Sequence, residues 1–81
     1  MMLKRSWVDG VLSLLDIEDI EKLKAEYYNG DESKLSFDES QNEAERVAML
    51  AEWLDSIKWK FLKEFKIELY DGTKYKIKFC D

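Results

Sequence analysis

Apolar residues recur at intervals of three and four positions in the first third of the chain, at Ile17, Ile20, Leu23 and Tyr27. This spacing is typical of one face of an α-helix. Ser6 and Asp16 each begin a stretch that resembles a helix cap, and Asn29-Gly30 provides a stop. The pattern predicts one bent helix or two short ones, and a hairpin turning at Asp9-Gly10 is the less favoured alternative.

A longer amphipathic pattern follows. Overlapping caps at Asp38 and Ser40 open it, and we place its end near Phe61 or Leu62. Its apolar stripe, which we expect to pack on a sheet, consists of Val47, Leu50, Ala51, Leu54, Ile57 and Phe61. Just before this helix, the segment Lys34–Phe37 is compatible with a short strand.

The end of the chain alternates between apolar and charged residues from Phe65 to Phe79, as a half-buried β-hairpin does. A three-residue loop at Tyr70, Asp71 and Gly72, with Gly72 at positive φ, gives a register with one apolar face. That register pairs Leu69 with Thr73, Ile67 with Tyr75 and Phe65 with Ile77, and on the other face Glu68 with Lys74, Glu64 with Lys78 and Lys66 with Lys76.

These elements predict one small α+β domain spanning residues 1–81. It would contain an N-terminal helix or helix pair, a short strand within residues 34–38 as an open alternative, a long amphipathic helix and a C-terminal antiparallel β-hairpin. A lone hairpin is marginally stable in water, so we expect the extra strand or a homodimer to complete the sheet. No internal repeat is evident from the sequence.

Composition excludes several classes of chemistry. The chain is 46% hydrophobic and 14% aromatic, which is typical of a folded domain and not of a disordered one. It has no histidine and a single cysteine, Cys80, so it lacks the commonest zinc ligand, the usual general base and an internal disulfide. No apolar run reaches the roughly 18 residues of a membrane span. We expect a cytoplasmic protein without enzymatic activity, metal, cofactor or membrane contact.

Charge is unevenly distributed along the chain. The net charge of −5 combines an acidic stretch before residue 56 with a basic one after it. Carboxylates are dense at Glu18, Asp19 and Glu21, where a negative surface could dock on a basic protein and imitate nucleic acid. Carboxylates at helix starts also have a purely structural explanation in the helix dipole.

Large apolar residues that lie off the predicted helical stripe are a second candidate surface. Met49, Trp53 and Trp59 fall outside that stripe, and Tyr27 and Tyr28 could extend it. Residues of these types are enriched at the centres of protein interfaces. The alternative is that the N-terminal helices cover them.

The lysines of the hairpin admit two interpretations. They could bind nucleic acid, with Lys66 and Lys76 as the two that lack an acidic neighbour across the hairpin. They could instead protect the hairpin from edge-to-edge aggregation. We therefore predict a non-catalytic protein–protein interaction module. Its most concrete form is a small acidic inhibitor, of the kind carried by phages or mobile elements, that acts on a basic or nucleic-acid-handling protein. Nucleic-acid binding by the hairpin is the alternative.

Overall fold

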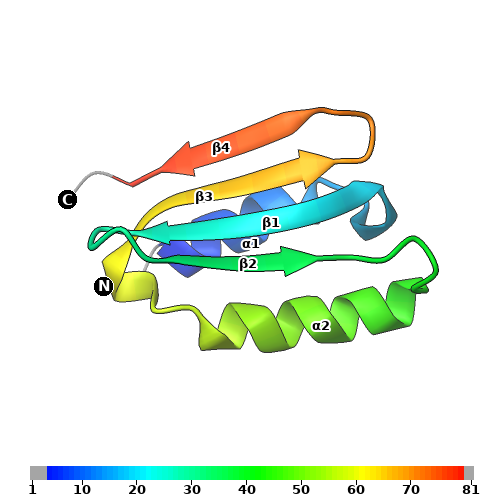
Figure 1. Cartoon of the computed structure of the whole chain (residues 1–81), viewed down its shortest axis with the longest axis horizontal. Helices are drawn as coiled ribbons and strands as arrows, with labels where there is room; N and C mark the ends of the chain where they lie inside the picture. Colours follow the sequence, from blue (N-terminus) through cyan, green and yellow to red (C-terminus); the bar gives the residue numbers. More distant parts are fainter. Residues whose placement is uncertain (1–3, 80–81) are drawn as a thin grey trace.

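The computed structural model describes residues 4–79 and contains a four-stranded antiparallel sheet, in the order β2-β1-β3-β4, with two helices on one of its faces (Figure 1). In chain order the elements are α1 (Lys4–Ser13), the 3-10 turn η1 (Ile17–Asp19), β1 (Ile20–Tyr27), β2 (Glu32–Ser36), α2 (Glu43–Ser56), the 3-10 turn η2 (Trp59–Phe61), β3 (Leu62–Leu69) and β4 (Lys74–Lys78).

The expected architecture is wrong, because two strands lie between the helices and the sheet is not a C-terminal hairpin that follows them. Residues 20–27, expected to be helical, form β1. Leu23 and Ala25 are fully buried while Lys22 and Lys24 alternate with them on the other side of the strand. Leu23 also fits the three-and-four spacing of a helix. The segment forms a strand because its alternating face is buried against the helices, and this tertiary burial outweighs the local helical pattern. The short strand within residues 34–38 is present as β2, although it begins earlier.

The long helix is also shorter than expected. It opens with a capping box at Asn42, whose side chain accepts from the Glu45 N–H while the Glu45 side chain accepts in return, and it ends at Ser56. Ile57 is already extended, so η2 and not a further helical turn carries Phe61. The expected stripe is rotated as well, since Val47 is 50% exposed and Phe61 55% exposed, whereas Trp53 is buried.

The hairpin register is confirmed. β3 and β4 pair Glu64 with Lys78, Phe65 with Ile77, Lys66 with Lys76, Ile67 with Tyr75 and Glu68 with Lys74. Gly72 has φ of 92°, a left-handed conformation that a residue without Cβ adopts without strain. The turn chemistry and the alternating pattern together determine this register.

The core lies between the sheet and the helices. Its fully buried members are Val8 from α1, Ile20, Leu23 and Ala25 from β1, and Leu62, Phe65 and Ile67 from β3. Trp53 of α2 contacts the Phe65 ring at 5.6 Å between centroids. No helix of residues 4–79 covers the opposite face of the sheet (Figure 1).

An internal repeat emerges from the structure, contrary to the expectation from sequence. The unit α1-η1-β1-β2 corresponds to α2-η2-β3-β4 at a constant separation of 42 residues, as between Gly30 and Gly72, which share the same left-handed φ. Backbone contacts repeat too: the Tyr28 N–H donates to the Phe61 carbonyl at 3.1 Å, and the Tyr70 N–H donates to the Asp19 carbonyl at 3.0 Å.

The two repeats meet at the antiparallel pairing of β1 with β3. Corresponding residues pair reciprocally, so that Leu23 faces Ile67 and Ala25 faces Phe65, while Lys24 faces its own counterpart, Lys66. The sheet therefore has an approximate twofold axis that passes between Lys24 and Lys66.

Candidate binding face of the sheet

The face of the sheet away from the helices carries almost only charged side chains. Alternation along each strand sends the apolar residues to the core and the following residues to the open face: Lys22, Lys24 and Glu26 of β1; Glu32, Lys34 and Ser36 of β2; Glu64, Lys66 and Glu68 of β3; Lys74, Lys76 and Lys78 of β4. Such a face cannot pack on an apolar layer, so it is a surface for solvent or for a charged partner.

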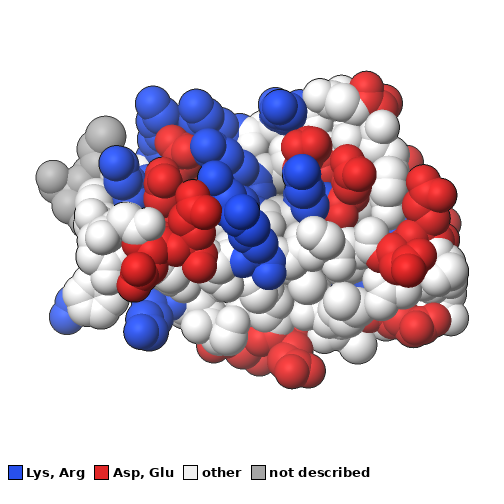
Figure 2. Space-filling model, viewed as in Figure 1, with Lys and Arg blue, Asp and Glu red and all other residues white. Residues whose placement is uncertain are grey.

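The strand register arranges these side chains in three rows that cross the strands. The lysine row consists of Lys34, Lys24, Lys66 and Lys76; the acidic row consists of Glu32, Glu26, Glu64 and, at its end, Lys78; the mixed row consists of Ser36, Lys22, Glu68 and Lys74. Figure 2 shows the lysine row as a blue band across the molecule with red carboxylates on either side. With strands about 4.8 Å apart, the row extends over about 14 Å.

Like charges directly opposite one another on neighbouring strands destabilise a sheet. Neighbouring carboxylates offset this cost in part, since Lys24 and Lys34 lie 3.0 and 3.8 Å from Glu32 and Lys66 lies 3.1 Å from Glu64. Lys76 has no ion pair within residues 4–79. The fold therefore carries a row of like charges whose mutual repulsion is offset only in part by its own ion pairs.

Ion pairing also shifts the pKa values of three groups on this face, Lys24, Glu32 and Glu64. The hydrogen bond to Glu32 raises the pKa of Lys24, and the same bond lowers the pKa of Glu32. Burial acts to raise the pKa of Glu64, but its hydrogen bond to Lys66 and the charges of nearby lysines prevail, and that pKa is lowered. Ion pairing thus favours the charged forms of Lys24, Glu32 and Glu64.

A shallow hollow of about 470 Å³ lies between the lysine row and the mixed row. Six lysines and one carboxylate surround it, together with four other residues: Lys22, Lys24, Lys34, Lys66, Lys74, Lys76 and Glu68, then Leu23, Ser36, Ile67 and Tyr75. In a chain of net charge −5, this concentration of cations gives the hollow a local positive charge that attracts anionic groups.

The structure distributes the sequence-predicted partner-binding residues over three places. Glu18 and Asp19 are exposed in η1, and Glu21 is half-buried at the start of β1. Their end of the molecule is organised by Arg46, which is only 4% exposed. Its guanidinium donates to the carbonyls of Glu18, Asp38 and Gln41, at 3.1 to 3.2 Å.

The two off-stripe residues of α2 lie beside β2. The Trp53 indole N–H donates to the Ser33 hydroxyl at 2.9 Å, and Met49 is half-buried near it. Trp53 therefore belongs to the core, but its contacts are with β2 and with Phe65 of β3 and not with the N-terminal helices that the alternative invoked.

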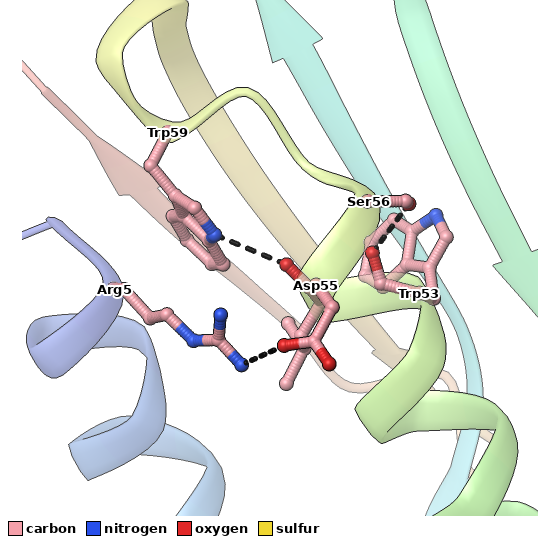
Figure 3. Close-up of polar contacts among 6 residues, drawn as sticks. Arg5, Trp53, Asp55, Ser56 and Trp59 are labelled. Atoms are coloured by element: carbon pink, nitrogen blue, oxygen red, sulfur yellow. Dashed lines mark hydrogen bonds and ion pairs between the residues drawn. The ribbon is translucent and has the colours of Figure 1, made fainter.

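The remaining three residues lie around η2. Trp59 stacks on Phe65 at 6.3 Å and donates to the Leu54 carbonyl at 3.0 Å, beside the ion pair of Arg5 with Asp55 that joins α1 to α2 (Figure 3). The Tyr27 hydroxyl accepts from the Lys58 N–H. The Tyr28 hydroxyl donates to the Phe79 carbonyl. Each of these side chains thus has a structural contact, and the eight predicted residues do not form one surface.

Lys66 and Lys76, the alternative nucleic-acid-binding residues, are neighbours in the lysine row. Sequence reasoning missed Lys24 and Lys34, which complete it. A signal was available, because Lys24 and Lys34 alternate with apolar residues in the same way as Lys66 and Lys76, before and after a turn glycine. The helical interpretation of residues 17–27 concealed it.

Within residues 4–79, no group of three or more metal-ligating side chains gathers in one place. No helix of the described part of the chain is long and apolar enough to span a membrane. Cys80 lies outside the described residues. Comparisons of the chain with family models, with curated proteins and with solved structures gave no match.

Proposed function

We propose that this protein is a non-catalytic protein-interaction module that binds an acidic segment of a partner on the open face of its sheet. The observation that carries the proposal is the hollow surrounded by six lysines and one carboxylate. Lysine ammonium groups on flexible stems form charge-assisted hydrogen bonds to carboxylates with little geometric demand.

The like-charged row supports a binding role over a purely protective one. Lysines that only prevent aggregation are needed at the edges of a sheet. Lys24 and Lys66 lie at its centre, on the approximate twofold axis, where they oppose each other and contribute nothing to edge protection. A cost in stability at the centre of an exposed face is typical of a functional surface.

The striped charge favours a protein partner over nucleic acid. A phosphate backbone is uniformly negative, and the carboxylates of the acidic row lie one residue pair from the lysine row, well inside the screening length of about 10 Å at moderate salt. The hollow contains no arginine, and Tyr75 is its one aromatic residue. A protein surface can place acidic groups on the lysine row and basic groups on the acidic row, which adds specificity.

The test compares two matched variants. Lys24→Gln/Lys66→Gln removes the centre of the row, and Lys58→Gln/Lys60→Gln removes the same charge from exposed positions outside it. With a glutamate-rich peptide as probe, we expect the first variant to bind about tenfold more weakly than the wild type and the second to bind almost unchanged. In a pull-down from lysate, the specific partner should be lost with the first variant only.

Equal binding by the two variants would contradict the proposal. A single-stranded oligonucleotide serves as the competing probe. Tighter binding of the oligonucleotide than of the peptide, with a steep loss as salt rises, would identify the face as a nucleic-acid site instead.

The acidic end of the molecule supports a second candidate, the small acidic inhibitor of a basic protein. Contacts with Arg46 bring the backbones of Glu18 and Asp38 together, and the side chains of Glu18, Asp19 and Asp38 have no ion pair within the described residues. Glu18→Lys/Asp19→Lys would then abolish capture of a basic partner. Capture that survives this reversal would remove the acidic end from consideration.

A further inference from the structure

β4 is an edge strand whose outward backbone groups can be assigned. The Leu69 N–H donates to the Thr73 carbonyl at 2.8 Å, and the Phe79 N–H donates to the Lys63 carbonyl at 2.9 Å. In an antiparallel pair, alternate residues of a strand direct both backbone groups to the same side. Residues 73, 75, 77 and 79 therefore bond to β3, and Lys74, Lys76 and Lys78 direct their N–H and carbonyl groups outward.

The side chains of these three residues point to the open face, where none has an ion pair within residues 4–79. The other edge strand differs, because Lys34 of β2 lies near Glu32 of the same strand. The β4 edge thus presents three unpaired ammonium groups in a line, next to three unused pairs of backbone groups.

The inner side of the β4 edge is apolar and open. In the β2 half, Met49 and Trp53 of α2 lie against the inner side of β2 together with Leu35. In the repeat, Trp7 and Val11 of α1 correspond to Met49 and Trp53, so the approximate twofold axis relates them to β4 as it relates Met49 and Trp53 to β2. Trp7 is 63% exposed and Leu14, one turn beyond Val11, is 85% exposed. Large exposed apolar side chains grouped in this way mark an interaction site.

We infer that the β4 edge takes an extended segment of a partner protein as a fifth strand, with acidic residues at alternate positions against Lys74, Lys76 and Lys78 and apolar residues between them against α1. The inference rests on the proposed function and gives it a binding mode, in which backbone bonds supply affinity and alternate side chains supply specificity. A second copy of this chain that pairs through its own β4 fits poorly, because Lys74, Lys76 and Lys78 would then oppose the same three lysines.

The probe is a peptide of alternating Glu and Val, about eight residues long, which is long enough to cover all of Lys74–Lys78 in β4. Its control has the same composition with Glu and Val in separate blocks. We expect the alternating peptide to bind about tenfold more tightly than the control. Amide hydrogen exchange measured by NMR should slow at Lys74, Lys76 and Lys78 on binding, because their N–H groups become bonded.

Two variants separate charge from backbone. Lys76→Gln and Lys76→Pro both remove the ammonium group, but only proline removes the outward N–H, and it leaves the bonds of residues 75 and 77 to β3 intact. We expect Lys76→Pro to bind the peptide about tenfold more weakly than Lys76→Gln. Trp7→Ser provides an independent variant, since an exposed residue is dispensable for folding, and should weaken binding about fivefold.

Exchange rates that stay unchanged when the alternating peptide binds would overturn the inference, and so would equal affinities for the two peptides. The proposed function fails separately. Binding of the glutamate-rich peptide could still require Lys24 and Lys66 while the alternating peptide binds no more tightly than its block control. That result would support the lysine row as a binding site and contradict the fifth strand. If neither peptide binds, both proposals fall.

Discussion

Around β2, helix α2 supplies Trp53, whose indole packs on Phe65 and bonds to Ser33. Around β4, the corresponding position of α1 is Val11, and the neighbouring Trp7 and Leu14 remain exposed. The two repeats have the same order of elements, the same turn glycines and the same central lysines. They differ at the edges of the sheet, because a large side chain covers the inner side of β2 and none within residues 4–79 does so at β4. The same unit thus serves as scaffold in one half and as a candidate docking edge in the other.

Some residues are identical at corresponding positions of the two repeats, and they fall into two groups, those that the fold requires and those that we assign to binding. Gly30 and Gly72 are required by their left-handed φ. Tyr28 and Tyr70 hold the ends of the opposite repeat through their hydroxyls, at the Phe79 and Phe37 carbonyls. Lys24 and Lys66 each form an ion pair with a glutamate, but they also oppose each other across the central strand pair, where like charges destabilise the sheet. Their retention in both repeats supports a role in binding.

The largest expected effect comes from exchanging the closed edge for an open one. Trp53→Ala removes a buried ring and leaves a cavity, so we expect a loss of about 3 to 4 kcal/mol in the free energy of unfolding. Val11→Ala, at the equivalent position, should cost only about 1 kcal/mol. Urea unfolding followed by fluorescence measures both values, and similar losses would show that α1 closes β4 as tightly as α2 closes β2.

The two ends of the sheet offer the next comparison. Arg46 is buried under the rings of Phe37 and Tyr70, and Lys4 occupies the corresponding place over Tyr28 and Phe79. Arg46→Ala leaves three carbonyls without their donor and should lower the free energy of unfolding by about 2 to 3 kcal/mol.

Lys4→Ala should lower the free energy of unfolding by about 1 kcal/mol, less than Arg46→Ala. The Lys4 ammonium donates to the Lys60 and Leu62 carbonyls at the start of α1, where water can replace it more easily than at the buried Arg46. A loss at Lys4 as large as that at Arg46 would mean that the two ends are equally fixed.

A smaller effect of opposite sign tests the lysine row. Lys76→Thr removes a like-charge contact with Lys66 and no ion pair, so the free energy of unfolding should rise by about 0.5 kcal/mol. Lys74→Thr removes the lysine opposite Glu68 and should lower it by about 0.3 kcal/mol. Thermal unfolding of both variants beside the wild type measures these two changes in stability. If both variants gained or both lost stability, repulsion between Lys66 and Lys76 would not explain the effect.

The smallest effect concerns pH. The pKa of Glu64 is lowered in the folded protein, so its carboxylate contributes stability that is present above the ordinary glutamate value of 4.5 and is lost as pH falls through the lowered value. Glu64→Gln should therefore flatten the decline of the urea midpoint from about pH 6 to about pH 3. An unchanged slope would place the acid sensitivity elsewhere, for example at Glu32.

Sequence reasoning succeeded where local chemistry decides the structure. The turn at Asp71-Gly72 and the alternation of Phe65, Ile67 and Leu69 determine the register of β3 with β4 without reference to the rest of the chain. It failed at β1, because Ile20 and Leu23 satisfy the spacing of a helix as well as the core face of a bulged strand. Only burial between β2 and β3 separates the two possibilities.

The missed strand also concealed the site. Once β1 is taken for a helix, Lys24 and Lys34 cannot be aligned with Lys66 and Lys76, and the repeat is not visible. Comparison of the segment after Gly30 with that after Gly72, where lysine, an aliphatic residue and phenylalanine recur in the same order, would have revealed both.

The pairing of β1 with β3 has a consequence for how the chain folds. Each hairpin closes within its own repeat over a few residues, whereas β1 and β3 join segments about half a chain apart. Short-range closures form in microseconds and distant pairings are slower. We therefore expect the two half-molecules to form first and then to dock, joined by a tether, the segment between β2 and α2. Its length sets the effective concentration at which one half meets the other, so lengthening this tether should slow refolding in stopped-flow fluorescence while changes in the hairpin turns leave the docking step unaffected.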